Sequence, residues 1–421
     1  MPVIILMLGT GIYFTVATGF FQLRGIRTIL RKTVGKCFGE KKEGSSQLSP
    51  VQAFFTSLAA TVGTGSVTGV AAALATGGAG AVFWMWVSAL FGMMTAFAEN
   101  VLGGLFRKEL PDGTKCGGAM YYMEKGLGSK ALGRVFAFCC VLASLGMGNM
   151  AQSNSISTAL SQYKIPPAAV GAVIAAAIGF VIFGSKKRAG GVSEKLVPFM
   201  AGFYIIGCVI AAVMNYRAII PCFKQIFSEA FNLRSAVGGG LGTVISTGFR
   251  RGIFSNEAGL GTTVAVHGSS TVTDPCEQGM WGIFEVFIDT IVICTLTAVV
   301  ILTSGASYSS GGSDVVVRAF ESGFNGFGGI FVAASIVLFA FATLIGWSFI
   351  GTQAWEYLFP KGRNFYKAAF TACVFVGAVS GLDIVWGISD TFNGLMIIPN
   401  LAAVVLLRTT VLSEFRSKNE K

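Results

Sequence analysis

Charge is scarce in this chain. Only 12% of its 421 residues are charged and 53% are hydrophobic, whereas a soluble domain usually carries about 25% charged residues. This shortage excludes an ordinary soluble domain and predicts an all-α polytopic membrane protein. Apolar windows long enough to cross a bilayer as helices occur in eleven places, near 2–22, 51–76, 80–106, 133–159, 167–184, 196–215, 237–266, 280–304, 327–354, 365–382 and 385–408.

Groups that carry enzyme chemistry are also scarce. The single histidine, His267, has no sequence partners that would complete a metal site or a Ser-His pair. The nine cysteines are scattered, mostly within apolar runs, and none forms a Cys-x-x-Cys pair. We therefore expect no enzymatic activity and no bound cofactor.

Basic residues are more abundant than acidic ones, and their distribution indicates a topology. The net charge is +11. When loops are assigned alternately to two sides, one side receives the basic clusters within 24–42, 107–134, 186–195, 361–367 and 408–421. The other side keeps only Lys164, Arg217, Lys224, Arg234 and Arg318. The positive-inside rule then predicts a plasma-membrane protein with its N-terminus outside and its C-terminus in the cytoplasm. Nucleic-acid binding is not expected, and a lipid-specific role of these residues is a secondary interpretation.

The ends and connections predict no further folded unit. The first apolar window begins almost at Met1 without a charged segment before it, so we expect a retained span rather than a cleaved signal. The polar connections 40–47 and 307–313 are short, so no soluble domain is inserted between spans. The bilayer is the expected surrounding, and no obligate protein partner is indicated.

The second apolar window contains residues that weaken a helix. It reads Ala60-Thr-Val-Gly-Thr-Gly-Ser-Val-Thr-Gly69, in which the glycines permit non-helical backbone and the Thr and Ser side chains supply hydroxyls. Unwound backbone at membrane depth persists only where it is buried in protein or lines a polar cavity, because unsatisfied groups cost several kcal/mol each. The segment therefore predicts a binding site, although close packing of two helices through small residues is an alternative.

The seventh apolar window is interrupted in the same way. It contains Gly238-Gly-Gly-Leu-Gly242, Ser246-Thr-Gly-Phe-Arg-Arg-Gly252 and Ser255-Asn-Glu-Ala-Gly-Leu-Gly261. Apart from the first window, the interrupted windows are the first and the sixth of ten, which is the arrangement expected of two inverted five-helix repeats with a substrate site at the midplane. Arg250 and Arg251 are either charges at a helix end or part of an internal gate.

Seven motifs resemble the alanine or glycine:cation symporter family. They occur in order between about Gly9 and Leu407 and read Gly63-Thr-Gly-Ser-Val-Thr-Gly-Val, Val82-Phe-Trp-Met-Trp-Val-Ser-Ala, Gly118-Ala-Met-Tyr-Tyr-Met-Glu-Lys-Gly-Leu-Gly, Gly148-Asn-Met-Ala-Gln-Ser-Asn-Ser, Phe254-Ser-Asn-Glu-Ala-Gly-Leu-Gly, Phe339-Ala-Phe-Ala-Thr-Leu-Ile-Gly-Trp-Ser and Asp390-Thr-Phe-Asn-Gly-Leu-Met-Ile-Ile-Pro-Asn. The chain departs from the family where Ser66 replaces the usual asparagine, and also at Ala79, Ala96 and Ala119.

The resemblance implies a fold similar to the leucine transporter, with a 5+5 inverted repeat, one extra N-terminal span and two discontinuous helices. It also implies import of alanine or glycine together with Na⁺ by alternating access. We accordingly predict an extra span and basic linker at 1–48, a first repeat at 49–215, a second repeat at 216–408 and a cytoplasmic tail at 409–421.

A small zwitterionic amino acid needs partners for a carboxylate and an ammonium group. The backbone N–H groups of Thr64, Gly65 and Ser66 suit the carboxylate, because a half-helix would begin there with the positive end of its dipole. Gln152 is an amide within an otherwise apolar window and is predicted either to contact the substrate or to join two helices. Asn149 and Asn154 have the same two interpretations.

Selection for a small substrate needs a bulky wall. Trp347 is the predicted wall, and its alternative is a place in the aromatic belt at the membrane surface. Phe249 is a weaker candidate for the same role, since aromatic core packing also explains it. For Na⁺, the predicted ligands are the carbonyls of Ala60 and Gly63 and the hydroxyl of Thr343, which lies one helical turn before Trp347.

Four acidic residues fall within apolar windows, where a charged side chain is costly. Glu285 and Asp289 are spaced i, i+4 and face one side of a helix, whereas Glu99 and Glu257 lie in other windows. They are expected to lock helices together through hydrogen bonds, with ion or proton movement as an alternative. The corresponding alternative function is a proton-coupled carrier; an ion channel is a further class, but two different breaks in one chain do not resemble a symmetric filter.

Overall fold

The computed structural model describes residues 2–37, 47–109, 113–184, 186–232, 240–309, 311–324 and 326–419. In the N-terminal half, the elements in chain order are α1 (Pro2–Ala17), α2 (Phe21–Arg24), α3 (Ile26–Lys32), α4 (Val34–Cys37), α5 (Pro50–Thr61), η1 (Thr64–Ser66), α6 (Thr68–Gly77), α7 (Gly80–Phe106), β1 (Lys108–Glu109), β2 (Lys115–Cys116), α8 (Ala119–Lys125), α9 (Lys130–Leu145), η2 (Gly146–Met150), α10 (Ala151–Ser161), α11 (Pro167–Ile182) and α12 (Lys186–Met214).

The second half is also helical. Its elements are η3 (Tyr216–Ala218), α13 (Ile219–Ala230), α14 (Leu241–Asn256), α15 (Val264–His267), α16 (Pro275–Val286), η4 (Phe287–Cys294), α17 (Thr295–Thr303), α18 (Gly312–Phe324), α19 (Gly328–Leu358), α20 (Arg363–Val379), α21 (Leu382–Leu406) and α22 (Arg408–Asn419). The strands β1 and β2 form a short antiparallel pair in which Lys108 lies opposite Cys116.

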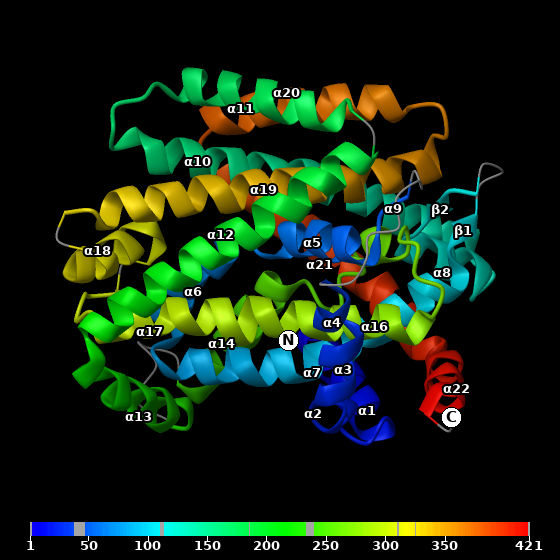
Figure 1. The fold of residues 1–421 in the computed structure, drawn as a ribbon, viewed down its shortest axis with the longest axis horizontal. Coiled ribbons are helices and arrows are strands. Elements are labelled where there is room, and N and C mark those ends of the chain that lie inside the picture. Colours follow the sequence, from blue (N-terminus) through cyan, green and yellow to red (C-terminus); the bar gives the residue numbers. More distant parts are fainter. Residues whose placement is uncertain are drawn as a thin grey trace.

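The long helices lie side by side across the molecule, as Figure 1 shows for α7, α12, α16 and α19. α7 packs against α14 and α16, whereas α19 packs against α5, α9, α10 and α12. α11 and α20 pack against each other on one outer side. The short elements α8, β1, β2 and α22 gather at one end of the bundle, and α13 and α18 lie at the opposite end.

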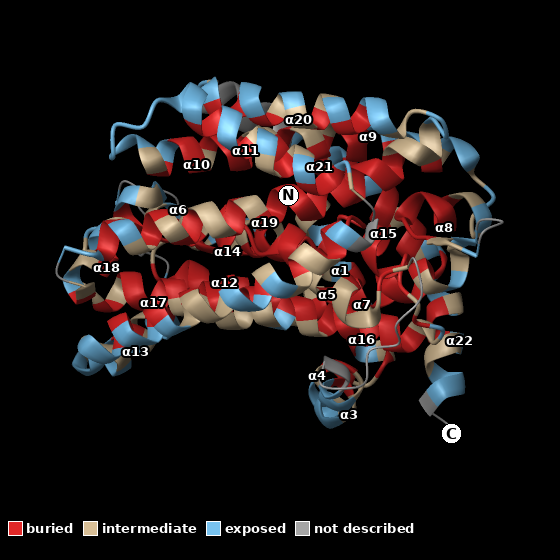
Figure 2. Ribbon diagram, turned by 45° about the horizontal axis from the view of Figure 1, so that its top comes forward, coloured by how far each residue is buried: buried red, intermediate tan, exposed pale blue. Residues whose placement is uncertain are grey.

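The core runs along α19, which is apolar on nearly all sides. Most of its residues from Phe339 to Ala354 are buried (Figure 2), as expected of a helix surrounded by other helices. The outer pair α11 and α20 is different, because large apolar side chains such as Val173, Phe180 and Phe375 are exposed on it. An apolar exterior of this kind suits lipid rather than water.

By length and composition, the described residues contain five helical stretches suited to crossing a membrane. A sixth results if Thr391–Leu406 and Arg408–Lys418, which are bent by 56° to each other, count as one span. The five stretches are Gly80–Phe106, Lys130–Ser161, Arg188–Met214, Pro275–Thr303 and Gly328–Leu358. The chain is therefore a helical membrane protein, as its composition predicts.

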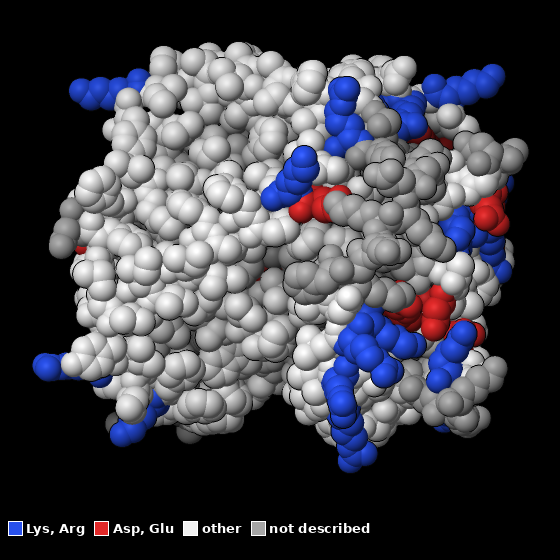
Figure 3. All heavy atoms as spheres, viewed as in Figure 1, with Lys and Arg blue, Asp and Glu red and all other residues white. Residues whose placement is uncertain are grey.

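Charged side chains are unevenly distributed over the surface in Figure 3. Lys and Arg gather mainly at the end where α3, α8 and α22 lie, whereas much of the remaining visible surface carries few charged side chains. Two segments named from the sequence are only partly described by the structure. Gly238 and Gly239, and most of the connection 40–47, lie outside the described residues.

Candidate functional site

The chain leaves the α-helix between Thr61 and Thr68, where the sequence predicts the first break. The backbone of Gly63 is extended, with φ −120° and ψ −157°. It is followed by a single 3₁₀ turn, in which the Ser66 N–H donates to the Gly63 carbonyl at 3.2 Å. The last hydrogen bond of α5 runs from the Val62 N–H to the Leu58 carbonyl, so the Ala60 carbonyl belongs to the final turn, whose carbonyls lack helical partners.

A second interruption follows α14, which ends at Asn256. Glu257 is left-handed with φ 55°, and Gly259 and Gly261 have φ values of 92° and 72°, a region that glycine enters without steric cost. The chain becomes helical again only in the short α15. Of the glycine-rich stretches predicted to interrupt this window, only the last, 255–261, extends into the irregular residues 257–263, whereas 246–252 lies within the regular helix α14.

Side chains from two other helices lie against the first break. The Thr64 hydroxyl donates to Gln152 Oε1 at 3.1 Å, and Gln152 Nε2 donates to the Met147 carbonyl at 3.1 Å. A Cβ atom at Gly63 would lie 2.7 Å from Thr343 Oγ1 and 3.6 Å from Gln152 Oε1. The structure thus brings together four of the predicted site residues.

α19 approaches α5 closely at Gly346, where only the backbone and the methyl group of Ala60 lie opposite. A Cβ atom at Gly346 would lie 2.6 Å from the Ala60 nitrogen, closer than van der Waals contact allows. Thr343, one turn earlier, donates its hydroxyl to the Phe339 carbonyl at 2.9 Å, which leaves the hydroxyl oxygen as an acceptor toward Gly63. Thr343 Oγ1 therefore lies against Gly63, and Gly346, one turn further along α19, lies against Ala60.

Trp347 is in the interior and not in an aromatic belt at the membrane surface. Its side chain is fully buried, and its Nε1 donates to Glu257 Oε1 at 3.2 Å. The indole also packs on Gly148, where a Cβ atom would lie 2.3 Å from Trp347 Cγ. Trp347 thus connects the second break to the helix that carries Gln152.

Phe249 lies away from these contacts. It is buried on α14 with its ring centroid 5.8 Å from that of Trp84, which agrees with the core-packing interpretation. The aromatic residue of α14 that approaches the first break is Phe254, whose ring lies 3.6 Å from the Cβ position of Gly65. Sequence reasoning missed this role, although Phe254 begins one of the family motifs.

Asp289 connects the first break to the last turn of α14 through hydroxyl groups. Its carboxylate accepts hydrogen bonds from Ser66 at 2.6 Å, from Ser255 at 2.7 Å and from Thr290 at 2.9 Å. Ser66 and Ser255 also lie 3.2 Å apart. The signal that could have found this cluster was a hydroxyl in each broken segment together with one acid in an apolar window.

The other buried carboxylates have separate partners. Glu285 accepts from Ser57 at 2.8 Å and Thr61 at 3.1 Å, and it pairs with His267 Nε2 at 2.8 Å. Glu99 accepts from the Gly259 N–H at 3.3 Å and from Asn400. These contacts agree with the expectation that the acids hold helices together.

Two stretches of π-helix lie beside the breaks. η2 precedes Gln152, and η4 contains Asp289. Such stretches are rare and are frequent at functional sites. Of the two arginines with alternative interpretations, Arg250 is exposed and Arg251 is half-buried, and both lie within α14 rather than at its end.

Known proteins of similar sequence and structure are membrane transporters. The sodium/alanine symporter AgcS of Methanococcus maripaludis is 41% identical over 428 residues, covering 99% of this chain and 94% of AgcS. The amino-acid carrier protein AlsT of Bacillus subtilis is 38% identical, covering 96% of this chain and 86% of AlsT. The crystal structure of MhsT in complex with L-phenylalanine has the same fold, with a TM-score of 0.65 at 15% identity and coverage of 86% of this chain and 90% of MhsT.

The sequence of the whole chain also matches one family. The matched region is 1–421, and the family description is that of sodium:alanine symporters. The chain is therefore a cation-coupled amino acid transporter and not an enzyme. The resemblance found in the motifs is confirmed: this chain belongs to the sodium:alanine symporter family.

Proposed function

We propose that the chain is a Na⁺-coupled symporter that imports alanine or glycine by alternating access. The observation that carries the proposal is the group of oxygen atoms around the first break, where Gly63 faces Thr343 and Thr64 contacts Gln152. Unwound carbonyls beside a hydroxyl suit Na⁺, and exposed N–H groups at the start of a helix suit a carboxylate. The name of the relative AgcS supports the same pairing of ion and substrate.

Within this proposal, the Ala60 and Gly63 carbonyls and the Thr343 hydroxyl bind Na⁺. The N–H groups of Thr64 and Gly65 receive the substrate carboxylate, while that of Ser66 is already used within the 3₁₀ turn. Gln152 contacts the substrate, and its link to Thr64 supports this role. In this assignment one short segment of backbone takes part in both the ion site and the substrate site.

Trp347 forms the wall that limits substrate size in this proposal. Its complete burial and its bond to Glu257 hold the indole in one position. Phe249 is a weaker wall than Phe254, because Phe254 is the ring that approaches Gly65. A rigid wall excludes larger side chains more strongly than a pocket that only lacks favourable contacts.

The proposed topology has eleven spans, preceded by an outside N-terminus and followed by a cytoplasmic C-terminus. The spans are α1, α5–α6, α7, α9–α10, α11, α12, α14–α15, α16–α17, α19, α20 and α21. The interrupted pairs α5–α6 and α14–α15 then occupy equivalent places in repeats 49–215 and 216–408, after the extra span of 1–48. The gathering of Lys and Arg at one end of the bundle supports this orientation, with the tail 409–421 on the cytoplasmic side.

The test is uptake of labelled alanine and glycine into proteoliposomes with Na⁺, Li⁺ or K⁺ outside. We expect uptake with Na⁺ and expect Thr343→Ala to raise the Na⁺ concentration for half-maximal uptake by about tenfold, since a bond to a charged group contributes about 1.5–3 kcal/mol. Gln152→Ala should raise the KM for substrate instead. Thr352→Ala in α19 and Gln162→Ala, directly after α10, are the controls, because their side chains bond locally to the Ser348 and Ala159 carbonyls. If the two control variants changed the Na⁺ dependence and the KM as much as Thr343→Ala and Gln152→Ala do, the site assignment would be contradicted.

Proton coupling is the second candidate, and the contact of Asp289 with Ser66 favours it, because it puts an acid at the first break. Glu285 lies on the same helical stretch and contacts α5 through Ser57. Uptake driven by a Na⁺ gradient at clamped pH separates the candidates. Uptake that follows ΔpH alone and is abolished in Asp289→Asn would replace the sodium proposal with this one.

A further inference from the structure

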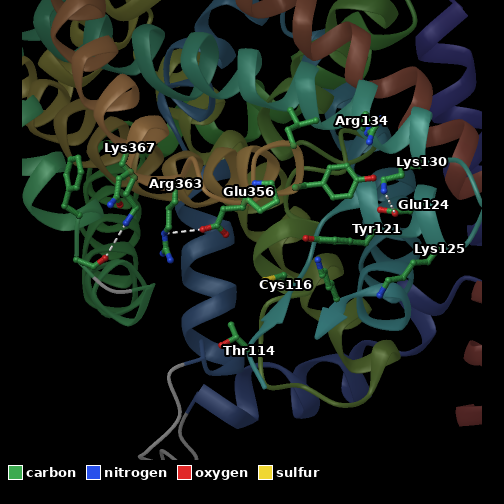
Figure 4. A pocket seen from close by; sticks show the side chains of 17 residues that line it. Thr114, Cys116, Tyr121, Glu124, Lys125, Lys130, Arg134, Glu356, Arg363 and Lys367 are labelled. Carbon is green, nitrogen blue, oxygen red and sulfur yellow. Dashed lines mark hydrogen bonds and ion pairs between the residues drawn. The ribbon is translucent and has the colours of Figure 1, made fainter. Parts of the chain in front are cut away.

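A wide basic cleft lies at the end of the molecule that carries α8 and the β1–β2 hairpin (Figure 4). Its volume is about 1060 Å³, which is large for a single small ion. Its described lining comes from β1, β2, α8 and the adjoining ends of α9, α11, α19 and α20, and does not include residues of α5, α6, α14 or α15. The cleft is therefore separate from the candidate transport site.

Positive charge predominates in this cleft. Six basic residues line it, and two carboxylates, Glu124 and Glu356, offset only part of their charge. The six are Lys108, Lys125, Lys130, Arg134, Arg363 and Lys367. The carboxylates pair with Lys130 at 3.9 Å and with Arg363 at 3.3 Å, so basic residues outnumber acidic ones in the lining.

The cations are held on two facing walls rather than spread over a flat surface. In Figure 4, Arg363 and Lys367 of α20 lie on one side, and Lys130 and Arg134 of α9 lie on the other. Lys367 is itself 7% exposed and donates to the Ile182 and Gly184 carbonyls at the end of α11. A group that binds between these walls would contact cations from both sides.

The surroundings of the cleft are also crowded with positive charge. Burial, and after it the positive charge of Arg107, lowers the pKa of Lys115 in β2. Arg107 itself follows the last residue of α7 and donates to the Val272 carbonyl at 2.7 Å. A positive potential of this kind favours a ligand with concentrated negative charge, and a phosphate group provides it.

The cleft borders the apolar exterior of the bundle. Phe183 lines the cleft and is 52% exposed, while Phe180 on the same helix is 72% exposed. On α20, Phe365 is 68% exposed and lies between Arg363 and Lys367 in the sequence. Basic side chains beside exposed aromatic rings mark the level at which lipid headgroups meet acyl chains, and basic pockets between helices bind anionic headgroups.

We propose that this cleft is a binding site for a phosphate-bearing anion. Its neighbouring apolar surface identifies an anionic phospholipid as the source, with the phosphate between the α9 and α20 walls and the acyl chains along the outer pair α11 and α20. A soluble phosphate compound has the same headgroup chemistry but leaves the exposed rings of Phe180 and Phe365 uncovered.

The experiment measures thermal unfolding of the purified full-length protein by intrinsic tryptophan fluorescence. Phosphatidylglycerol and phosphatidylcholine with identical acyl chains are titrated into the detergent solution, and inorganic phosphate and glycerol phosphate are titrated in parallel. A ligand that binds the folded state raises Tm as its concentration increases. We expect saturable stabilisation by phosphatidylglycerol, a smaller effect of phosphatidylcholine and little effect of the soluble phosphates.

Three variants connect the effect to the cleft. Lys130→Gln with Arg134→Gln should weaken the apparent affinity for phosphatidylglycerol about 25-fold, since each basic residue near an anionic surface contributes about fivefold. Arg24→Gln with Arg27→Gln removes the same charge from exposed residues outside the cleft and should retain the affinity. Glu124→Gln removes a competing carboxylate and should strengthen binding about fivefold. All the substituted side chains are partly or fully exposed, so each variant is expected to fold.

Two results would overturn the proposal. Equal stabilisation of the parent by both lipids, with no effect of the soluble phosphates, would show that no anion site exists. An equal loss of affinity in the cleft pair and the Arg24/Arg27 pair would show a diffuse surface effect. Saturable stabilisation by a soluble phosphate that the cleft variants abolish would support the phosphate site and replace the lipid as its source.

Discussion

Single side chains shape the polar surface at the first break. Gly63 has room for no side chain, because Thr343 Oγ1 occupies the space that a Cβ atom would need. Thr64 and Gln152 complete the same surface through their hydrogen bond. At this scale the site is a small polar surface made from neutral groups, with the nearest acid, Asp289, on the side of Ser66.

Trp347→Phe should widen the range of substrates. The smaller ring leaves space and removes the N–H that donates to Glu257. In the enlarged pocket, the preference for alanine over a larger neutral amino acid such as leucine should fall about tenfold. Competition of leucine with labelled alanine uptake measures the change.

Trp281→Phe is the matched control for this prediction. Trp281 is also fully buried, but its ring lies 4.8 Å from that of Phe54, in a different part of the core. Its substitution should alter Tm and leave the selectivity unchanged. If leucine competes equally in both variants and in the parent, Trp347 is not the wall.

The residue contacts were only partly predictable from sequence. Gln152 and Thr343 stood out because a polar side chain in an apolar helix must find a partner. The contacts of Asp289 could not be predicted in this way. Its spacing of four residues from Glu285 predicts that both side chains share one face of an α-helix. The π-helix η4 begins between them, and the two carboxylates contact different segments of chain, Asp289 through Ser66 and Glu285 through Ser57.

At the scale of elements, regular α-helix is absent at 62–67 and 257–263, which lie within the two segments predicted to be interrupted. The part of the second segment from 246 to 252 is nevertheless regular helix within α14. The windows 80–106 and 327–354 correspond closely to α7 and α19, which remain helical although each contains two adjacent glycines. The π-helix η2 could not be predicted, since an i, i+5 hydrogen-bond pattern leaves no distinct periodicity in five residues.

Gly148→Ala tests whether the packing of η2 on α19 is required. The added Cβ atom would lie 2.3 Å from Trp347 Cγ, and the buried indole has no space to move away. We expect destabilisation of about 1–3 kcal/mol and loss of uptake, because overpacking displaces backbone. Thermal unfolding and proteoliposome uptake measure the two effects.

The control for this prediction is Gly202→Ala in α12. A Cβ atom at Gly202 meets nothing within 4 Å, so the substitution should preserve uptake and Tm. If Gly148→Ala behaves like this control, then η2 and α19 separate easily and Trp347 is not held in place. A fall in Tm with full uptake would limit the role of the contact to stability.

At the scale of the whole molecule, the gathering of Lys and Arg at one end is the basis of the proposed orientation. Seven of the eight cysteines whose side chains the structure describes are buried, so labelling of introduced cysteines has a low background. Ser161→Cys, at the exposed end of α10, should react with a membrane-impermeant maleimide in intact cells. Ser417→Cys in α22 should react only after permeabilisation, and the reverse pattern would contradict the proposed orientation.

The helical membrane fold was predictable because a chain in lipid must satisfy its backbone hydrogen bonds internally. Apolar windows must become helices, and basic loops favour one side. The small elements were not predictable, because α8 has seven residues and β1 and β2 have two each, which is too short to leave a distinct periodicity. Their position beside α9 and α20 created the basic cleft, which no local pattern of Lys and Arg indicates.

The bare contact between Gly346 and Ala60 has a consequence for motion. At this point α19 contributes no side chain, and α5 contributes only the small methyl group of Ala60, so no long side chain has to leave a groove if the two helices move apart here. If the proposed Na⁺ site is correct, an ion bound by Ala60, Gly63 and Thr343 would bridge α5 and α19 beside this contact and oppose their separation.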